Sequence, residues 1–149
     1  MATIKWLVTT SLTTLLSTGL DDLISGNETE SAEFDNTAGL DLMADFIFAA
    51  AYASAPAANV KCAELYIEPA VDGTNYPTVT AGGLPQKSLL IGAFELPQNI
   101  ATLQYMVLSG VPLPPLKLKF RLSNTSAQTM ASSATAKFLK IQPYRLQST

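Results

Sequence analysis

The sequence predicts an all-β fold, an antiparallel β-sandwich that is jelly-roll-like and has about eight short strands. Apolar and polar residues alternate in several short segments, most clearly over 116–123, where four apolar side chains alternate with three basic ones and a serine. Turn-forming segments such as "GGLPQ" and "PLPP" separate them, and no helical period of any length is sustained. A period of two is typical of strands with one buried face, and many short strands with glycine and proline turns indicate a sandwich.

The first two expected strands span residues 3–9 and 12–18, which are rich in Thr, Val, Ile and Leu. A helix over 12–24 is the alternative, because its leucines also fit a 3.6-residue period. Gly19 and three threonines disfavour that helix. We expect one domain over 1–149, with residues 1–28 as an N-terminal arm or edge segment.

Residues 29–36 and 40–48 are expected to form a pair of strands joined by "NTAG". In this interpretation one face of the second strand carries Leu40, Leu42, Ala44, Phe46 and Phe48. Asp41 and Asp45 would then lie on the opposite face as solvated edge carboxylates.

Further strands are expected at 61–68, 88–95, 102–109, 116–123 and 136–145, and Asp72-Gly73 is a turn dipeptide. Alternation within these segments predicts which side chains are buried between the two sheets. The predicted core contains Phe46, Phe48, Leu65, Ile67, Leu118 and Phe120.

The composition argues against a freely soluble monomer and against common catalytic chemistry. Hydrophobic residues make up 48% of the chain and charged residues 14%, which is a low share of charge for a soluble domain. We therefore expect apolar surface to be covered by copies of the chain or by another protein. With one cysteine and no histidine, the usual zinc and nucleophile–base sites are not expected, nor is any cofactor. No apolar run suits a membrane span or a signal peptide, so cytosolic synthesis is expected.

Acidic and basic residues are separated along the chain. Residues 1–60 hold eight acidic residues and one basic residue, whereas residues 61–149 hold four acidic and eight basic ones. Two interpretations follow: acidic and basic strands pair within one molecule, or an acidic face of one subunit meets a basic face of its neighbour. A pI near 4.8 does not favour nucleic acid as a partner.

Residues 110–124, "GVPLPPLKLKFRLSN", provide the candidate docking residues. Pro112, Pro114 and Pro115 fix backbone angles and set the direction in which the following strand starts. That strand is expected to present a row of basic side chains outward. These side chains either dock onto an acidic partner or protect a strand edge from aggregation. The row consists of Lys117, Lys119 and Arg121.

The loop "VDGTNYP" is the other candidate contact region. Asp72 could contribute to a calcium site, although the loop lacks the several carboxylates that such sites use. Tyr76 is the tyrosine best placed to be exposed, as a sugar-binding platform on a jelly roll would require. No pair of carboxylates is placed for general acid–base catalysis.

Four phrases, "EFDN", "LDLMADF", "ELYIEPAVDGTNY" and "GVPLPPLKLKFRLSNTSAQ", carry a resemblance. Residues 31–145 resemble a group of small proteins encoded among the virion genes of tailed bacteriophages. The resemblance implies a virion structural protein of β-sandwich type, and it brings no catalytic residues.

The expected function is that of a capsid decoration, or cement, protein located at the capsid surface of the virion. It would bind the assembled head as a symmetric homo-oligomer, most simply a trimer, with the major capsid protein or other virion proteins as partners. No nucleic-acid or membrane partner is expected. A tail, neck or baseplate protein and a host-glycan-binding module are the alternatives.

Overall fold

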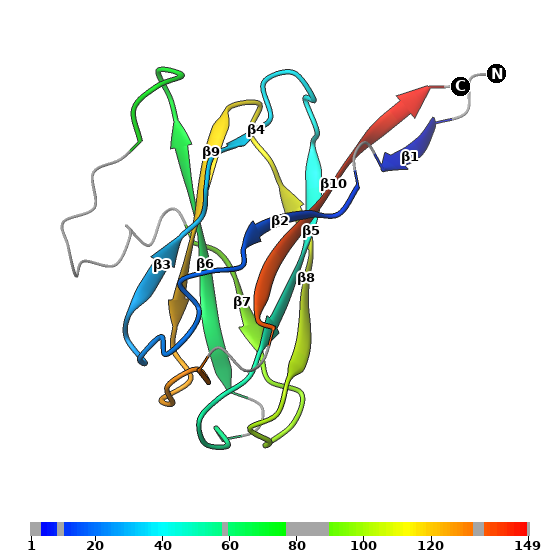
Figure 1. The fold of residues 1–149 in the computed structure, drawn as a ribbon. Coiled ribbons are helices and arrows are strands. Elements are labelled where there is room, and N and C mark those ends of the chain that lie inside the picture. The colour runs from blue at the N-terminus through cyan, green and yellow to red at the C-terminus, as the bar shows by residue number, and fades with distance from the viewer. Residues whose placement is uncertain (1–3, 9–10, 58–59, 77–89, 133–135, 149) are drawn as a thin grey trace.

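The fold is a sandwich of two antiparallel sheets (Figure 1). The computed structural model describes residues 4–8, 11–57, 60–76, 90–132 and 136–148, and within these ranges every regular element is a strand. No helix in the described residues is long and apolar enough to cross a membrane. Sheet A contains β1 (Ile4–Val8), β2 (Thr13–Leu16), β5 (Met43–Ala50), β8 (Gln104–Pro112) and β10 (Phe138–Ser148). Sheet B contains β3 (Glu28–Glu30), β4 (Phe34–Asp35), β6 (Lys61–Ala70), β7 (Leu90–Glu95) and β9 (Lys117–Asn124).

The strand order is that of a jelly roll. β1 and β2 both pair with β10, and β3 and β4 both pair with β9, so the ten strands occupy eight positions. Sheet A continues from β10 to β5 and β8, and sheet B continues from β9 to β6 and β7. Most connections therefore cross from one sheet to the other. The predicted jelly-roll-like sandwich with about eight strands is confirmed.

The core lies between the sheets and is built from the alternating positions that the sequence indicates. Phe46 and Phe48 of β5, and Leu118 and Phe120 of β9, are fully buried. The rings of Phe46 and Phe120 meet across the sandwich with centroids 5.1 Å apart. The predicted core is confirmed, because Leu65 and Ile67 of β6 are buried as well.

The N-terminal region is extended and contains no helix over 12–24. Strand β2 is shorter than the predicted 12–18, and the chain after it turns at Gly19, whose φ is +75°. A Cβ at Gly19 would lie 2.5 Å from Oγ1 of Thr29, so only glycine fits there. Leu20 and Leu23 are nonetheless buried in the core, which accounts for the helix-like spacing of leucines.

The predicted pairing of 29–36 with 40–48 is wrong. β3 and β4 belong to sheet B, whereas β5 belongs to sheet A, so this segment crosses between the sheets. The Asn36 side chain holds the crossing, because its Nδ2 donates to the carbonyl of Asp41 at 2.9 Å and its Oδ1 accepts from the Asp41 amide at 2.9 Å.

Two assignments within 40–48 are consequently wrong as well. Leu40 has a φ of +51°, and Leu40 and Leu42 are 54% and 52% exposed instead of buried, because β5 begins only at Met43. Asp41 is buried rather than solvated, and its Oδ1 has no hydrogen-bond partner among the described atoms. Asp45 is half-buried and accepts hydrogen bonds from the Gly110 amide and from the Tyr144 hydroxyl.

The proline-rich segment carries the chain from β8 in sheet A to β9 in sheet B. Pro112 ends β8, and the carbonyl of Pro114 accepts hydrogen bonds from Asn36 Nδ2 and from the Leu116 amide. Leu113 is buried, whereas Pro112 and Pro115 are exposed. The segment therefore acts as a rigid connection between the two sheets, next to the Asn36 crossing.

Candidate functional site

The outer face of sheet B carries a row of ion pairs along β9. Lys117 Nζ lies 3.1 Å from Glu33 Oε1, and Lys119 Nζ lies 2.6 Å from Glu30 Oε1. Their partners come from β3 and the segment after it, in the acidic part of the sequence. Pairing of acidic and basic strands within one molecule is therefore confirmed. We call the set Glu28, Glu30, Glu33, Glu68, Lys117, Lys119 and Arg121 the ion-pair ladder.

Arg121 is the most buried cation of the ladder. Its guanidinium contacts three carboxylates, with Nε 2.7 Å from Glu68 and Nη1 3.1 Å from Glu28, and with Nη2 bonded to Glu30. The Glu68 side chain is 1% exposed and that of Arg121 is 14% exposed. Because breaking a buried pair leaves an uncompensated charge, Arg121 is expected to hold β3, β9 and β6 together.

The position of β9 in sheet B excludes one of the two roles that the sequence suggested for its basic residues. β9 lies between β3/β4 and β6, so it is an interior strand, and the hypothesis that Lys117, Lys119 and Arg121 protect a sheet edge is wrong. Docking of the same side chains onto an acidic partner stays a prediction. A partner would have to compete with the glutamates that each cation already contacts.

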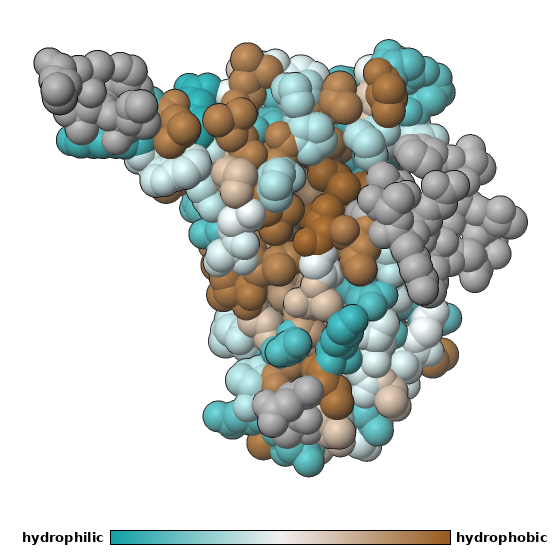
Figure 2. All heavy atoms as spheres, turned by 180° about the vertical axis from the view of Figure 1, so that it is seen from behind, coloured by the Kyte–Doolittle hydropathy of each residue, from teal (hydrophilic) through white to brown (hydrophobic). Residues whose placement is uncertain are grey.

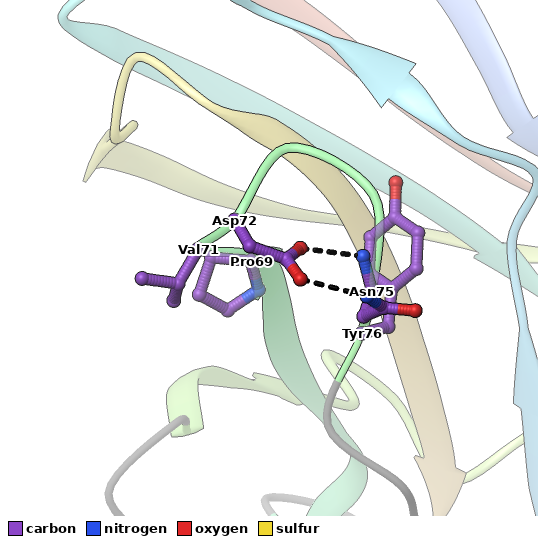
Figure 3. A pocket seen from close by; sticks show the side chains of 5 residues that line it. All are labelled: Pro69, Val71, Asp72, Asn75 and Tyr76. Atoms are coloured by element: carbon purple, nitrogen blue, oxygen red, sulfur yellow. Dashed lines mark hydrogen bonds between the residues drawn. The ribbon is translucent and has the colours of Figure 1, made fainter.

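The loop after β6 forms an open recess of about 350 Å³ at one end of sheet B (Figure 3). Asp72 accepts hydrogen bonds from the amides of Asn75 and Thr74 and from Nδ2 of Asn75, and these bonds lower the pKa of its carboxyl to about 2. Gly73, with a φ of +81°, completes the predicted turn by donating to the carbonyl of Ala70. Because both Asp72 oxygens already bind the loop itself, they stabilise the turn more readily than they ligate calcium.

Tyr76 links this recess to the ion-pair ladder. Its hydroxyl donates to Glu33 Oε2 at 2.6 Å, and the ammonium of Lys119 lies 4.9 Å from its ring centroid. Hydrogen bonds from Tyr76 and Lys117 lower the pKa of the Glu33 carboxyl below its usual range. Tyr76 is half-buried, not the exposed platform that the sequence suggested, and Lys119 occupies one face of the ring.

The outer face of sheet A has a different character: the composition predicted apolar surface, but sequence reasoning did not locate it on this face. The strand registers place Val8, Tyr144 and Met43 in one outward row across three strands, and Ile47 and Val107 in another. Val107 is 62% exposed and Val8 is 59% exposed. An antiparallel sheet with a solvated outer face normally alternates apolar and polar residues. β1 and β8 depart from this pattern, whereas β10 keeps Lys140 and Gln142 outward.

Aromatic residues extend this apolar surface at both ends. Tyr105 of β8 is 59% exposed, and its ring packs against Phe138 of β10 with centroids 6.1 Å apart. At the other end Trp6 of β1 makes an edge contact with Tyr144 at 5.2 Å. Thr14, Pro112 and Gln142 also point outward, at positions paired with Lys140, Met43 and Asp45. We call the following outward residues of sheet A the apolar face: Trp6, Val8, Met43, Asp45, Ile47, Tyr105, Val107, Phe138, Lys140, Tyr144 and Leu146.

The surface of the molecule shows where hydrophobic residues collect. In Figure 2, which shows the side turned away in Figure 1, hydrophobic atoms gather in the middle of the molecule and others lie at the base of the projecting β1–β10 end, with more polar atoms between them. A signal for the apolar face was present in the sequence. In β1 and β8 the outward positions include tryptophan, tyrosine and valine.

The structure brings only some of the predicted contact residues together. Lys117, Lys119 and Tyr76 meet through Glu33 and a cation–π contact. Asp72 lies beside them at the recess. The prolines lie in the connection between the sheets. Pro112 alone of these residues borders the apolar face, because it ends β8 opposite Met43.

Comparison with known proteins assigns no family to this chain. No protein-family model matches the chain, and no curated protein matches it either. A solved structure that is similar is the CBM36-1 domain of a multidomain xylanase from the hindgut metagenome of Trinervitermes trinervoides, with a TM-score of 0.43 and 10% identity over 99% of this chain and 97% of that one. At this distance the similarity carries no inference about a ligand.

Proposed function

We propose that the protein is a structural component of a tailed-phage virion, a decoration protein that binds the outside of the assembled head as a symmetric homo-oligomer, most simply a trimer. The observation that carries the proposal is the apolar face of sheet A, which a protein working alone in water would be expected to cover. The resemblance of residues 31–145 to phage virion proteins supports the same conclusion. The major capsid protein is the proposed partner.

The mechanism is stabilisation by binding. A protein that binds only the assembled shell shifts the equilibrium toward the assembled state by mass action, without any catalytic step. The protein would be made in the host cytoplasm and act on the capsid surface. A single buried thiol suits this role, because the fold contains no internal disulfide that the reducing cytoplasm would break.

Co-sedimentation with heads that lack the protein tests the proposal. The purified chain should pellet with undecorated heads in a saturable way, and decorated heads should resist heat or chelators better than bare ones. Recovery of labelled protein on tails, with no binding to heads, would instead support a tail, neck or baseplate protein.

The salt dependence of the same assay tests docking by the ladder. The double variant Lys117→Gln/Lys119→Gln keeps the more buried Arg121 intact, and Lys61→Gln serves as the control because Lys61 makes only a 3.8 Å pair with Glu64. If Lys117 and Lys119 dock, the double variant should bind more slowly and with less dependence on salt than the parent or the control. Equal binding by all three proteins at low and high salt would exclude electrostatic docking.

Glycan binding is the second candidate function, and the recess beside Asp72 favours it. The recess combines the Tyr76 ring with a carboxylate, the Asn75 amide and the apolar side chains of Pro69 and Val71. A glycan array provides the test. Binding of a defined sugar that is lost in Tyr76→Ala, with no affinity for heads, would favour this function over the decoration role.

A further inference from the structure

The end of sheet A is a two-stranded ribbon. β5 pairs with β10 only as far as Tyr144, whereas β1 pairs with β10 from Tyr144 to Ser148. From Arg145 onward, no described strand other than β1 lies beside β10. Figure 1 shows that this end projects away from the body of the sandwich. We call β1 together with Tyr144–Ser148 the ribbon.

The ribbon exposes apolar side chains that its own molecule does not cover. Trp6 is 59% exposed and Leu146 is 47% exposed, and the register places them opposite each other on the apolar face. An isolated two-stranded β-ribbon is marginally stable at best in water. The ribbon of this protein would be more stable if another surface packed against Trp6, Val8 and Leu146.

We propose that the ribbon of one copy packs on the apolar face of a second copy of this chain, over β5 and β8. The inference deepens the proposed function, on which it rests, by assigning the contact that joins the subunits. The receiving residues are Ile47, Tyr105 and Val107, which are apolar and partly or largely exposed.

The charge pattern of the face favours a second copy over a charged partner. Among the outward residues of the described sheet A strands, Asp45 and Lys140 are the charged ones, so the face has one charge of each sign. Asp45 is already hydrogen-bonded to Gly110 and Tyr144, and Lys140 lies 4.3 Å from the Phe138 ring centroid. A second copy matches such a surface without leaving a net charge in the interface, whereas a strongly acidic or basic partner would not.

The contact joins two different surfaces, so it either repeats head-to-tail or is exchanged reciprocally between two copies. The ribbon and the receiving strands β5 and β8 lie at different ends of the same sheet, so each copy would donate one surface and accept with another. Such heterologous contacts form a closed ring when the rotation between copies closes. This is the arrangement that a trimer requires.

Fluorescence of Trp6 provides the first test, because Trp6 is the single tryptophan of the chain. In the oligomer its emission should shift to the blue and acrylamide should quench it weakly, and dilution to monomer should reverse both effects. Ile47→Lys should expose Trp6 at concentrations where the parent oligomer protects it. Strong quenching of Trp6 in an oligomer of the parent protein would overturn the proposal.

Disulfide cross-linking provides the second test and defines the two surfaces. Cys62 is buried, so each single variant carries one accessible thiol. Under mild oxidation, a mixture of Val8→Cys and Val107→Cys should form cross-linked dimers, whereas a mixture of Val8→Cys with the control Val71→Cys should not. Val71 is 78% exposed and lies at the recess of sheet B. Absence of the Val8–Val107 cross-link in a stable oligomer would contradict the assignment.

These outcomes separate the inference from the proposed function. If the protein binds heads but Trp6 is protected only on the heads, the capsid protein covers the ribbon and the self-association assignment is wrong. If Trp6 is protected and the cross-link forms in an oligomer that ignores heads, the contact is established while the decoration role fails.

Discussion

Phe120 of sheet B packs against sheet A in the core. Its ring is fully buried, with its centroid 5.1 Å from that of Phe46 and 6.3 Å from that of Phe34. Phe120→Ala should lower the free energy of unfolding by about 3–5 kcal/mol, because it removes buried area and leaves a cavity. Thermal unfolding measures the effect, with Val71→Ala as an exposed control that should change stability little. An unchanged melting temperature for Phe120→Ala would contradict the core assignment.

Cys62 should be unreactive in the folded protein. It is fully buried, with Sγ 3.3 Å from the carbonyl of Phe94, and burial raises the pKa of its thiol to about 11. The raised pKa means that less thiolate is present at pH 8 than in the unfolded chain, and the thiolate is the reactive form. Titration with a thiol reagent should therefore detect no rapid reaction until denaturant is added. Prompt native-state labelling would show that β6 opens locally.

The ion-pair ladder stabilises sheet B unevenly along β9. Arg121→Met should lower the free energy of unfolding by about 3–5 kcal/mol, because Glu68 and Glu28 would keep their charges without a partner. Lys117→Met should lower the free energy of unfolding far less than Arg121→Met, since the Lys117–Glu33 pair is more exposed. Urea unfolding of the two variants measures the difference. Equal destabilisation would show that the ion pairs of Arg121 contribute no more to stability than the exposed pair of Lys117 with Glu33.

Elements with a complete alternation could be predicted from sequence, and elements held by side-chain hydrogen bonds could not. β9 and β5 show their buried positions directly, so Phe46 and Phe120 were placed correctly. Leu40 and Leu42 continue the alternation of β5, yet they lie outside the strand. Asn36 binds the backbone of Asp41 and turns the chain between the sheets, a contact that no periodic pattern reveals.

The partners within the ladder also depend on long-range topology. The separation of acidic and basic residues along the chain predicted pairing, but Arg121 meets Glu28 and Glu68 only because β9 lies between β3 and β6. The apolar face was missed for a related reason. Whether Trp6 and Val107 point outward depends on the registers of β1 and β8, which local sequence does not determine.

At the scale of the whole molecule the two outer faces of the sandwich differ in chemistry. Sheet B presents paired charges that suit contact with water, whereas sheet A presents aromatic and aliphatic side chains that extend onto the ribbon. A structural protein that assembles through one face and leaves the other in solvent would have this asymmetry. We therefore propose that the chain self-associates through sheet A.

Sedimentation velocity of the purified chain tests this central claim most directly. The account predicts a stable species of several subunits of 15.8 kDa each, most simply three, at micromolar concentration. The double variant Trp6→Lys/Val107→Lys should sediment as a monomer that still unfolds cooperatively, since both side chains are exposed in the single chain. A parent protein that sediments only as a monomer, or a double variant that assembles as the parent does, would contradict the account.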